Sequence, residues 1–155
     1  MEMSMERKWQ LAAQSLGMFV HHLMVPLKKR FGDKFLDVLR EHFDKLGKVM
    51  APLMKNVLNL EKLDADDLAK IIDWQDTLIG VKGEWVERTP KKATKHVTYC
   101  PILRDLMDCP EFCVDIMAAW IASMYRELNP KVKLSFDKLL AWGDDICSGT
   151  VEIED

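Results

Sequence analysis

The chain has 155 residues, of which 48% are hydrophobic and 30% charged, with a formal net charge of −3 at pH 7. These values are ordinary for a soluble globular protein and predict a single domain over residues 1–155. The mildly acidic charge argues against a nucleic-acid-binding protein, which usually carries a basic face. Because we find neither a signal-peptide core nor an apolar run long enough to span a membrane, we expect a cytoplasmic protein.

The first half of the chain, about 1–75, has the apolar spacing of helices. One apolar stripe runs along the first predicted helix: Trp9, Ala12, Ala13, Leu16, Phe19, Val20, Leu23 and Leu27. A second helix is expected to begin after Gly32, with Asp33 as its cap. Its predicted inner face contains Phe35, Val38, Leu39, His42, Phe43 and Leu46.

Two residues predict where these helices break and restart. Pro52 indicates a kink or a break, because the residue before a proline avoids the α region. Asp64 is followed by two more aspartates, a pattern typical of a helix start, where carboxylates cap free N–H groups. We therefore expect a third helix after Asp64.

The second half, about 76–155, alternates between strand and helix patterns. Strand-like alternation covers 78–88 and 94–100 as one hairpin, and 131–142 and 146–154 as another. A short helix over 101–107 and a longer one over 110–128 are expected between the hairpins. The predicted fold is therefore α+β, with a four-stranded antiparallel sheet and helices packed on one of its faces.

All four cysteines of the chain lie in this second half, namely Cys100, Cys109, Cys113 and Cys147. If their sulfurs converge, four thiolates could hold zinc or an iron–sulfur cluster. The spacing matches neither the zinc-ribbon knuckle nor the ferredoxin run. Two alternatives stay open, because cysteines also serve as nucleophiles or redox pairs and often simply pack in a core.

Three further side chains are candidates for proton transfer near these thiols. By strand alternation, His96 shares a face with Cys100 and is the best candidate for a base. Asp144 and Asp145 follow Gly143, where aspartates commonly form turns. As an alternative, either carboxylate could act as an acid or base.

Several segments resemble the L-2-amino-thiazoline-4-carboxylic acid hydrolase-like family. The similarity rests on Val-Thr-Tyr-Cys-Pro at 97–101, on Cys113, on Asn-Pro at 129–130, on Leu-Ala-Trp-Gly-Asp-Asp-Ile-Cys at 140–147, and on 30–47. The resemblance implies a small cytoplasmic α+β domain that opens the ring of an aminothiazoline carboxylate. More distantly, the order of elements is similar to that of 4-vinyl-reductase-type domains, which are small-ligand-binding modules.

The resemblance also bears on the cysteines. The cysteine positions of the family carry over to Cys100, Cys113 and Cys147, whereas Cys109 is an addition that would complete a four-thiol set.

Two functions follow as hypotheses. The first is a hydrolase of a small cyclic, cysteine-derived molecule, in which Cys113 or a metal-bound hydroxide attacks and Asp144, Asp145 or His96 moves protons. The second is a non-enzymatic domain in which the four cysteines hold zinc or an iron–sulfur cluster, and which senses redox state or a small ligand between the helices and the sheet. Either function predicts a small-molecule partner and neither nucleic acid nor membrane, and a homodimer is the assembly to consider.

Overall fold

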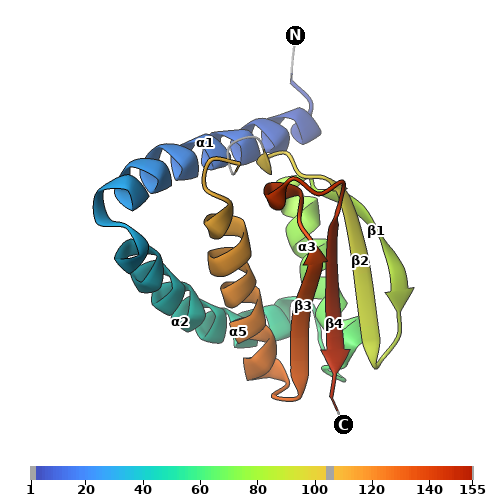
Figure 1. Cartoon of the computed structure of the whole chain (residues 1–155). Coiled ribbons are helices and arrows are strands. Elements are labelled where there is room, and N and C mark those ends of the chain that lie inside the picture. Colours follow the sequence, from blue (N-terminus) through green and yellow to red (C-terminus); the bar gives the residue numbers. More distant parts are fainter. Residues whose placement is uncertain (1–2, 104–106, 155) are drawn as a thin grey trace.

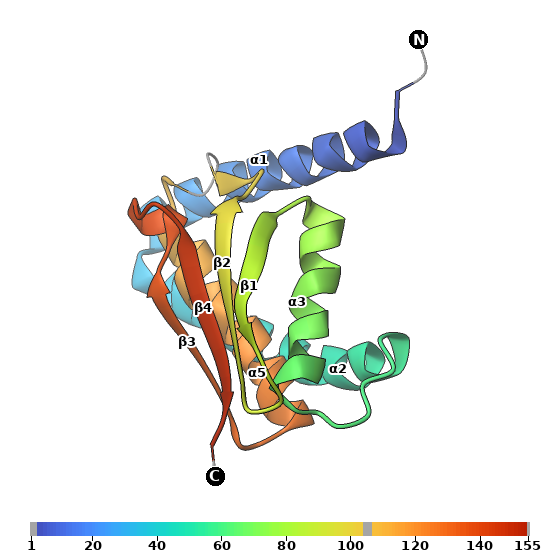
Figure 2. The same cartoon turned by 90° about the vertical axis from the view of Figure 1, so that its right-hand side faces the viewer.

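Long helices surround one face of a single sheet in the computed structural model, which describes residues 3–103 and 107–154 (Figure 1). The sheet has the strand order β1-β2-β4-β3, and all of its pairs are antiparallel. Helices α3 and α5 pack on the same face of the sheet, while α1 and α2 lie farther out (Figures 1 and 2). The predicted α+β class, with four antiparallel strands and helices on one face, is confirmed.

The first two helices are longer than their sequence patterns suggest. Helix α1 spans Met5–Phe31 and α2 spans Asp33–Val57, with only Gly32 between them. Gly32 has a φ of +61°, a conformation that glycine adopts without steric cost. Pro52 lies inside α2, so the predicted break is wrong and the helix continues past it.

The third helix begins where the aspartates predict. Helix α3 spans Ala65–Ile79, and the Asp64 side chain accepts a hydrogen bond from the backbone N–H of Asp67 at 3.0 Å. The Asp67 carboxylate in turn accepts from the backbone N–H groups of Lys62 and Leu63, at 2.7 and 3.0 Å. This pair of aspartates therefore fixes both the helix start and the loop that leads to it.

Three of the four strands are shorter than predicted, whereas β2 begins two residues earlier than its pattern indicates. Its strands are β1 (Lys82–Arg88), β2 (Lys92–Tyr99), β3 (Val132–Lys138) and β4 (Cys147–Ile153). The third strand was expected to reach residue 142, but Leu140–Trp142 form a single 3-10 turn, η2. The predicted short helix over 101–107 includes residues 104–106, which lie outside the described part of the chain.

The helix predicted over 110–128 has two parts. Residues Phe112–Met117 form a π-helical segment, η1, in which the Ala118 N–H donates to the Cys113 carbonyl five residues earlier. Helix α5 follows over Ala118–Leu128. Its buried Tyr125 hydroxyl donates to the Leu68 carbonyl of α3 at 3.0 Å, which joins the two helices that cover the sheet.

Helix α2 packs closely on the outer side of α5. A β carbon built at Gly47 would lie 2.5 Å from the Trp120 carbonyl oxygen and 2.9 Å from the Met124 nitrogen. Nearby, the Ser123 hydroxyl donates to the Asp44 carbonyl at 2.7 Å. The absence of a side chain at Gly47 is therefore what lets these two helices touch along their backbones.

The predicted inner face of α2 is only partly buried. Leu36, Gly47, Ala51 and Met54 are its buried residues. Val38, His42 and Leu46, which the sequence pattern placed inside, are exposed. The pattern was wrong here because α2 has apolar residues on two sides, and spacing alone does not tell which side meets the core.

We expect Gly47→Ala to destabilise the protein by about 1–3 kcal/mol, because the added methyl group pushes α2 away from backbone atoms that cannot yield. Alanine is otherwise the better helix former by about 1 kcal/mol, so the sign of the effect is informative. Urea unfolding measures it. Asn56→Ala, at an exposed position of the same helix, is the control and should be neutral or slightly stabilising. If Gly47→Ala and Asn56→Ala changed the free energy of unfolding equally, the close approach of α2 to α5 would be contradicted.

Candidate functional site

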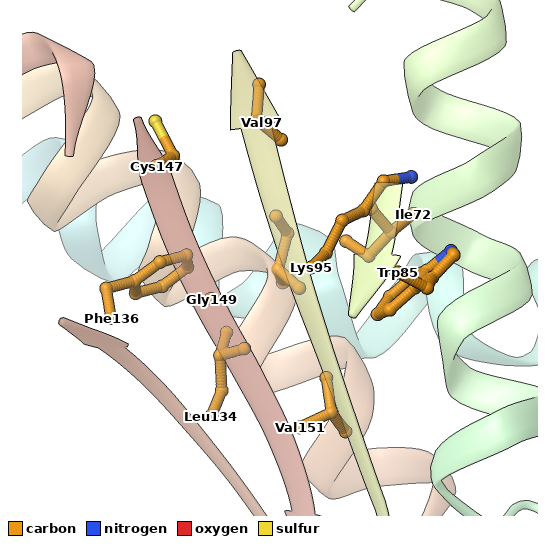
Figure 3. Close-up of a pocket in the computed structure, with 10 residues that line it drawn as sticks. Ile72, Trp85, Lys95, Val97, Leu134, Phe136, Cys147, Gly149 and Val151 are labelled. Carbon is orange, nitrogen blue, oxygen red and sulfur yellow. The ribbon is translucent and has the colours of Figure 1, made fainter. Parts of the chain in front are cut away.

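An apolar cavity lies between the sheet and the two helices that cover it. Its volume is about 90 Å³, and each of the four strands and both α3 and α5 contribute side chains. The lining residues are Ile72, Trp85, Lys95, Val97, Ile121, Leu134, Phe136, Cys147, Gly149 and Val151. Because alternate residues of a strand point to the same face, each strand presents its inward side chains here (Figure 3).

A glycine on β4 shapes one wall of this cavity. The ring of Phe136 on β3 lies against Gly149, and a β carbon at that glycine would be 3.0 Å from the ring (Figure 3). The ring therefore occupies space that a side chain at position 149 would fill.

The opposite wall contains a partly buried ion-pair network, in which Lys95 and Asp76 are the more buried members. The Lys95 ammonium lies 2.9 Å from a carboxylate oxygen of Asp73 and 2.7 Å from one of Asp76, both on α3. It also lies 4.8 Å from the centre of the Trp85 ring. The Trp85 N–H and an Arg88 N–H donate to Asp73 at 2.7 Å each. This network closes the cavity on the α3 side and fixes the Trp85 ring.

The two aspartates of the network have pKa values shifted in opposite directions. Burial raises the pKa of Asp76, and Lys95 only partly offsets that effect. Burial acts in the same direction on Asp73, but hydrogen bonds from Lys95, Trp85 and Arg88 outweigh it and lower its pKa. Asp73 is therefore the firmly ionised partner of Lys95.

Three of the four cysteines gather at the end of the cavity nearest to α1. Cys147 lines the cavity, and its sulfur accepts a hydrogen bond from the Leu140 N–H at 3.3 Å. Burial, together with a smaller electrostatic effect of Cys147 and Cys100, raises the pKa of Cys113 to about 12. Burial also raises the pKa values of Cys100 and Cys147. The three sulfurs are thus close enough to interact electrostatically, and all are protonated at neutral pH.

Cys109 belongs to a different part of the molecule. It is 1% exposed and packs with Met24 and Leu36 between α1 and α2. Burial and the neighbouring Glu111 carboxylate raise the pKa of Cys109. Within residues 3–103 and 107–154, no three His, Cys, Asp or Glu side chains are placed to hold a metal ion. The described residues therefore do not fit the predicted four-thiolate zinc or iron–sulfur site.

The three predicted proton-transfer residues do not face the cavity. His96 lies between Lys95 and Val97 on β2, and its side chain is on the other face of the sheet. Asp144 accepts a hydrogen bond from the Leu139 N–H at 2.7 Å, and Asp145 pairs with Lys138 at 3.0 Å. Both aspartates are thus engaged in the turn before β4, which is the turn-forming role considered for them in the sequence. Because β2 ends at Tyr99, alternation along the strand does not place Cys100, and the pairing of His96 with Cys100 stays a prediction.

A groove of about 380 Å³ opens next to Cys100. It is lined by Gln14 of α1 and by residues at and after the end of β2, namely Thr98, Tyr99, Cys100, Pro101 and Leu103. Cys100 lies in the groove and Cys147 in the cavity, and a charge on Cys147 acts on Cys100. The thiols therefore lie between a surface groove and the apolar interior.

Comparison with known proteins shows the fold alone. No protein-family model matches the chain, and no curated protein is significantly similar to it. Among solved structures, it is similar to a trafficking protein particle complex subunit 3 from Naegleria fowleri, with a TM-score of 0.67. The two are 14% identical, and the match covers 94% of this chain and 97% of the other. That subunit is described as covalently bound to palmitic acid.

Sequence reasoning missed the ion-pair network and the role of Phe136 and Gly149. Lys95 alternates with residues of the apolar face, and a lysine at an inward position of a central strand is the signal that could have revealed the network. No comparable signal marked Gly149, because its importance depends on the register between β3 and β4.

We expect the Cys113 thiol to react with iodoacetamide at least 100-fold more slowly in the folded protein than in urea at pH 8. A pKa of about 12 leaves very little thiolate at that pH, whereas an unfolded cysteine has a pKa of about 8.5. Mass spectrometry of the peptide that contains Cys113 measures both rates. Fast alkylation of the folded protein at pH 6 would show instead an activated nucleophile.

We expect Lys95→Met to destabilise the protein by about 3 kcal/mol at pH 7, because it leaves the Asp76 carboxylate buried without its partner. The destabilisation caused by Lys95→Met should become smaller as the pH falls toward 5. Burial raises the pKa of Asp76 above its unfolded value, so the folded state of the variant gains stability as that carboxyl takes up a proton. Urea unfolding at both pH values tests this. Lys133→Met, on the exposed side of β3, is the control, and an equally small effect of both changes would refute the network.

Proposed function

We propose that the protein is a non-enzymatic binding domain for an apolar small molecule, and that a single fatty acyl chain is its preferred class of ligand. The ligand would lie between the sheet and helices α3 and α5. The observation that carries this proposal is the apolar cavity there, which the four strands and both helices line together. Ligand sites in proteins are commonly concave and mainly apolar, with a few polar groups at the margin.

The size of the cavity sets a condition on binding. Sites for drug-sized ligands have volumes of about 300–1,000 Å³, several times larger than this cavity. Binding therefore requires the cavity to open, and the Phe136 ring over Gly149 is the side chain that can move to open it. A ligand that fills the enlarged space stabilises a conformation that the free protein seldom adopts.

The groove beside Cys100 supplies a route for such a ligand. An acyl chain that enters there would pass the three thiols and reach the cavity at Cys147. Protonated thiols suit this path, since a neutral cysteine behaves as a small apolar residue. The structural neighbour, which is described as bound to palmitic acid, supports the same class of ligand for this fold.

Hydrolysis of an aminothiazoline carboxylate stays a prediction and ranks second. A cysteine attacks as the thiolate, and burial holds the pKa of Cys113 at about 12. The predicted partner carboxylates, Asp144 and Asp145, are engaged in the turn before β4. Ring opening that disappears in Cys113→Ala, with folding retained, would reverse this ranking.

We expect the protein to bind tritiated palmitic acid saturably, with one site per chain, below the micelle concentration of the fatty acid. Val97→Phe fills the cavity from β2 and should weaken binding at least tenfold. His96→Phe adds an aromatic ring on the other face of the same strand and should leave binding unchanged. Circular dichroism checks that both variants fold. Gly149→Ala, a smaller change against the Phe136 ring, serves if Val97→Phe does not fold.

Two outcomes would contradict the proposed function. One is that the wild-type protein shows no saturable binding. The other is that Val97→Phe and His96→Phe bind palmitic acid equally well, because the ligand would then lie outside the cavity.

A further inference from the structure

Helix α1 has apolar residues on two sides: Ala13, Gly17 and Met24 are buried against its own molecule, and a second apolar set faces outward. On the inner side, Gln14 lines the groove, His21 lies 3.9 Å from Asp108, and Lys28 forms an ion pair with Glu111. On the outer side are six exposed apolar residues: Met5, Trp9, Ala12, Leu16, Phe19 and Leu23. We call these six residues the α1 stripe. A contiguous apolar patch that stays exposed on a soluble protein typically marks an interaction site, so the α1 stripe calls for a partner.

The α1 stripe has the spacing of a helix that packs against another helix. Its members follow one another at steps of four, three, four, three and four residues. This 3.5-residue period is that of the a and d positions of paired helices. At 1.5 Å per residue the stripe is about 27 Å long, which is enough for several layers of interlocking side chains.

The chemistry of the α1 stripe favours a protein partner over a membrane. From Trp9 to Leu27 the sequence contains no Asp, Glu, Lys or Arg. Interface cores are depleted in charge and enriched in aromatic residues and methionine, as this stripe is. A helix that lies on a membrane usually carries lysine and arginine along its polar side to meet lipid head groups.

The exposed area matches what a dimer of this chain needs. The five large members of the stripe are 47–66% exposed. With side-chain areas of roughly 150–250 Å², this leaves about 550 Å² of apolar surface on α1. A standard interface covers about 800 Å² on each partner, of which about 65% is apolar when the two partners are identical. The stripe alone therefore supplies the apolar part of such an interface.

We propose that α1 packs antiparallel against α1 of a second copy, about a two-fold axis that crosses the outer side of α1 at the level of position 14. In this register Trp9 lies opposite Phe19 of the second copy, Met5 opposite its Leu23, and Ala12 opposite its Leu16. All six members of the stripe then contact one another, as a symmetric interface requires. A shift of seven residues toward the C-terminus would place Met5 against Arg30. Helix α1 forms one edge of the molecule in both views, where a second copy has access (Figures 1 and 2).

Sedimentation equilibrium of the full chain tests this arrangement. We expect a dimer, and we expect Leu16→Glu to raise its dissociation constant at least 100-fold while the helical circular dichroism is retained. Leu53→Glu changes an equally apolar exposed position on α2 and should leave the dimer intact. A monomeric wild-type protein at 100 μM, or a dimer that Leu53→Glu but not Leu16→Glu disrupts, would overturn the proposal.

Cross-linking tests the antiparallel register. Ser15 lies beside the proposed axis, so Ser15→Cys should form an intermolecular disulfide on mild oxidation. Position 8 lies on the same flank of α1, but in this register it is far from position 8 of the second copy. Lys8→Cys should therefore not form a cross-link. The reverse result would overturn the antiparallel pairing. Binding of the monomer to vesicles of phosphatidylcholine and phosphatidylglycerol, abolished by Leu16→Glu, would overturn the proposal in favour of a membrane.

Discussion

Helix α2 approaches α5 so closely at Gly47 that a β carbon there would lie 2.5 Å from the Trp120 carbonyl oxygen. The rest of the helical layer depends on this contact. Helix α5 covers the sheet, α2 is held against α5, and α1 continues from α2 through Gly32 alone. The close packing of two backbones thus sets where α1 lies, and with it the position of the groove at Cys100 and of the outward-facing apolar stripe.

The cavity and the ion-pair network are two results of the same covering of the sheet. Helix α3 brings Asp73 and Asp76 to the sheet, where Lys95 on a central strand neutralises them. Beyond that network the inward side chains are apolar, and Gly149 leaves room that the Phe136 ring only partly fills. Charge is therefore confined to one wall, and the remaining interior suits an uncharged, flexible molecule better than a polar substrate that must be held for hydrolysis.

Local signals in the sequence predicted local structure well. The α3 start at Asp64 and the four strands follow from capping and alternation, which depend on neighbouring residues only. The predictions failed where distant segments decide. Cys109 is separated from the other thiols because α1 and α2 enclose it. The stripe of α1 was recognised as apolar, but periodicity does not reveal whether such a face meets its own core or another molecule.

The π-helical segment Phe112–Met117 has a consequence for how this chain can change over evolution. In a π-helix the N–H group bonds to the carbonyl five residues earlier instead of four. The segment therefore contains one residue more than an α-helix of the same length. Deletion of a single residue there would restore an ordinary helix and leave α5 in place against α2 and the sheet. It would also turn Cys113 by about 100° away from Cys100 and Cys147. Descendants of a common ancestor could thus gain or lose the third thiol by one insertion or deletion, with the fold unchanged.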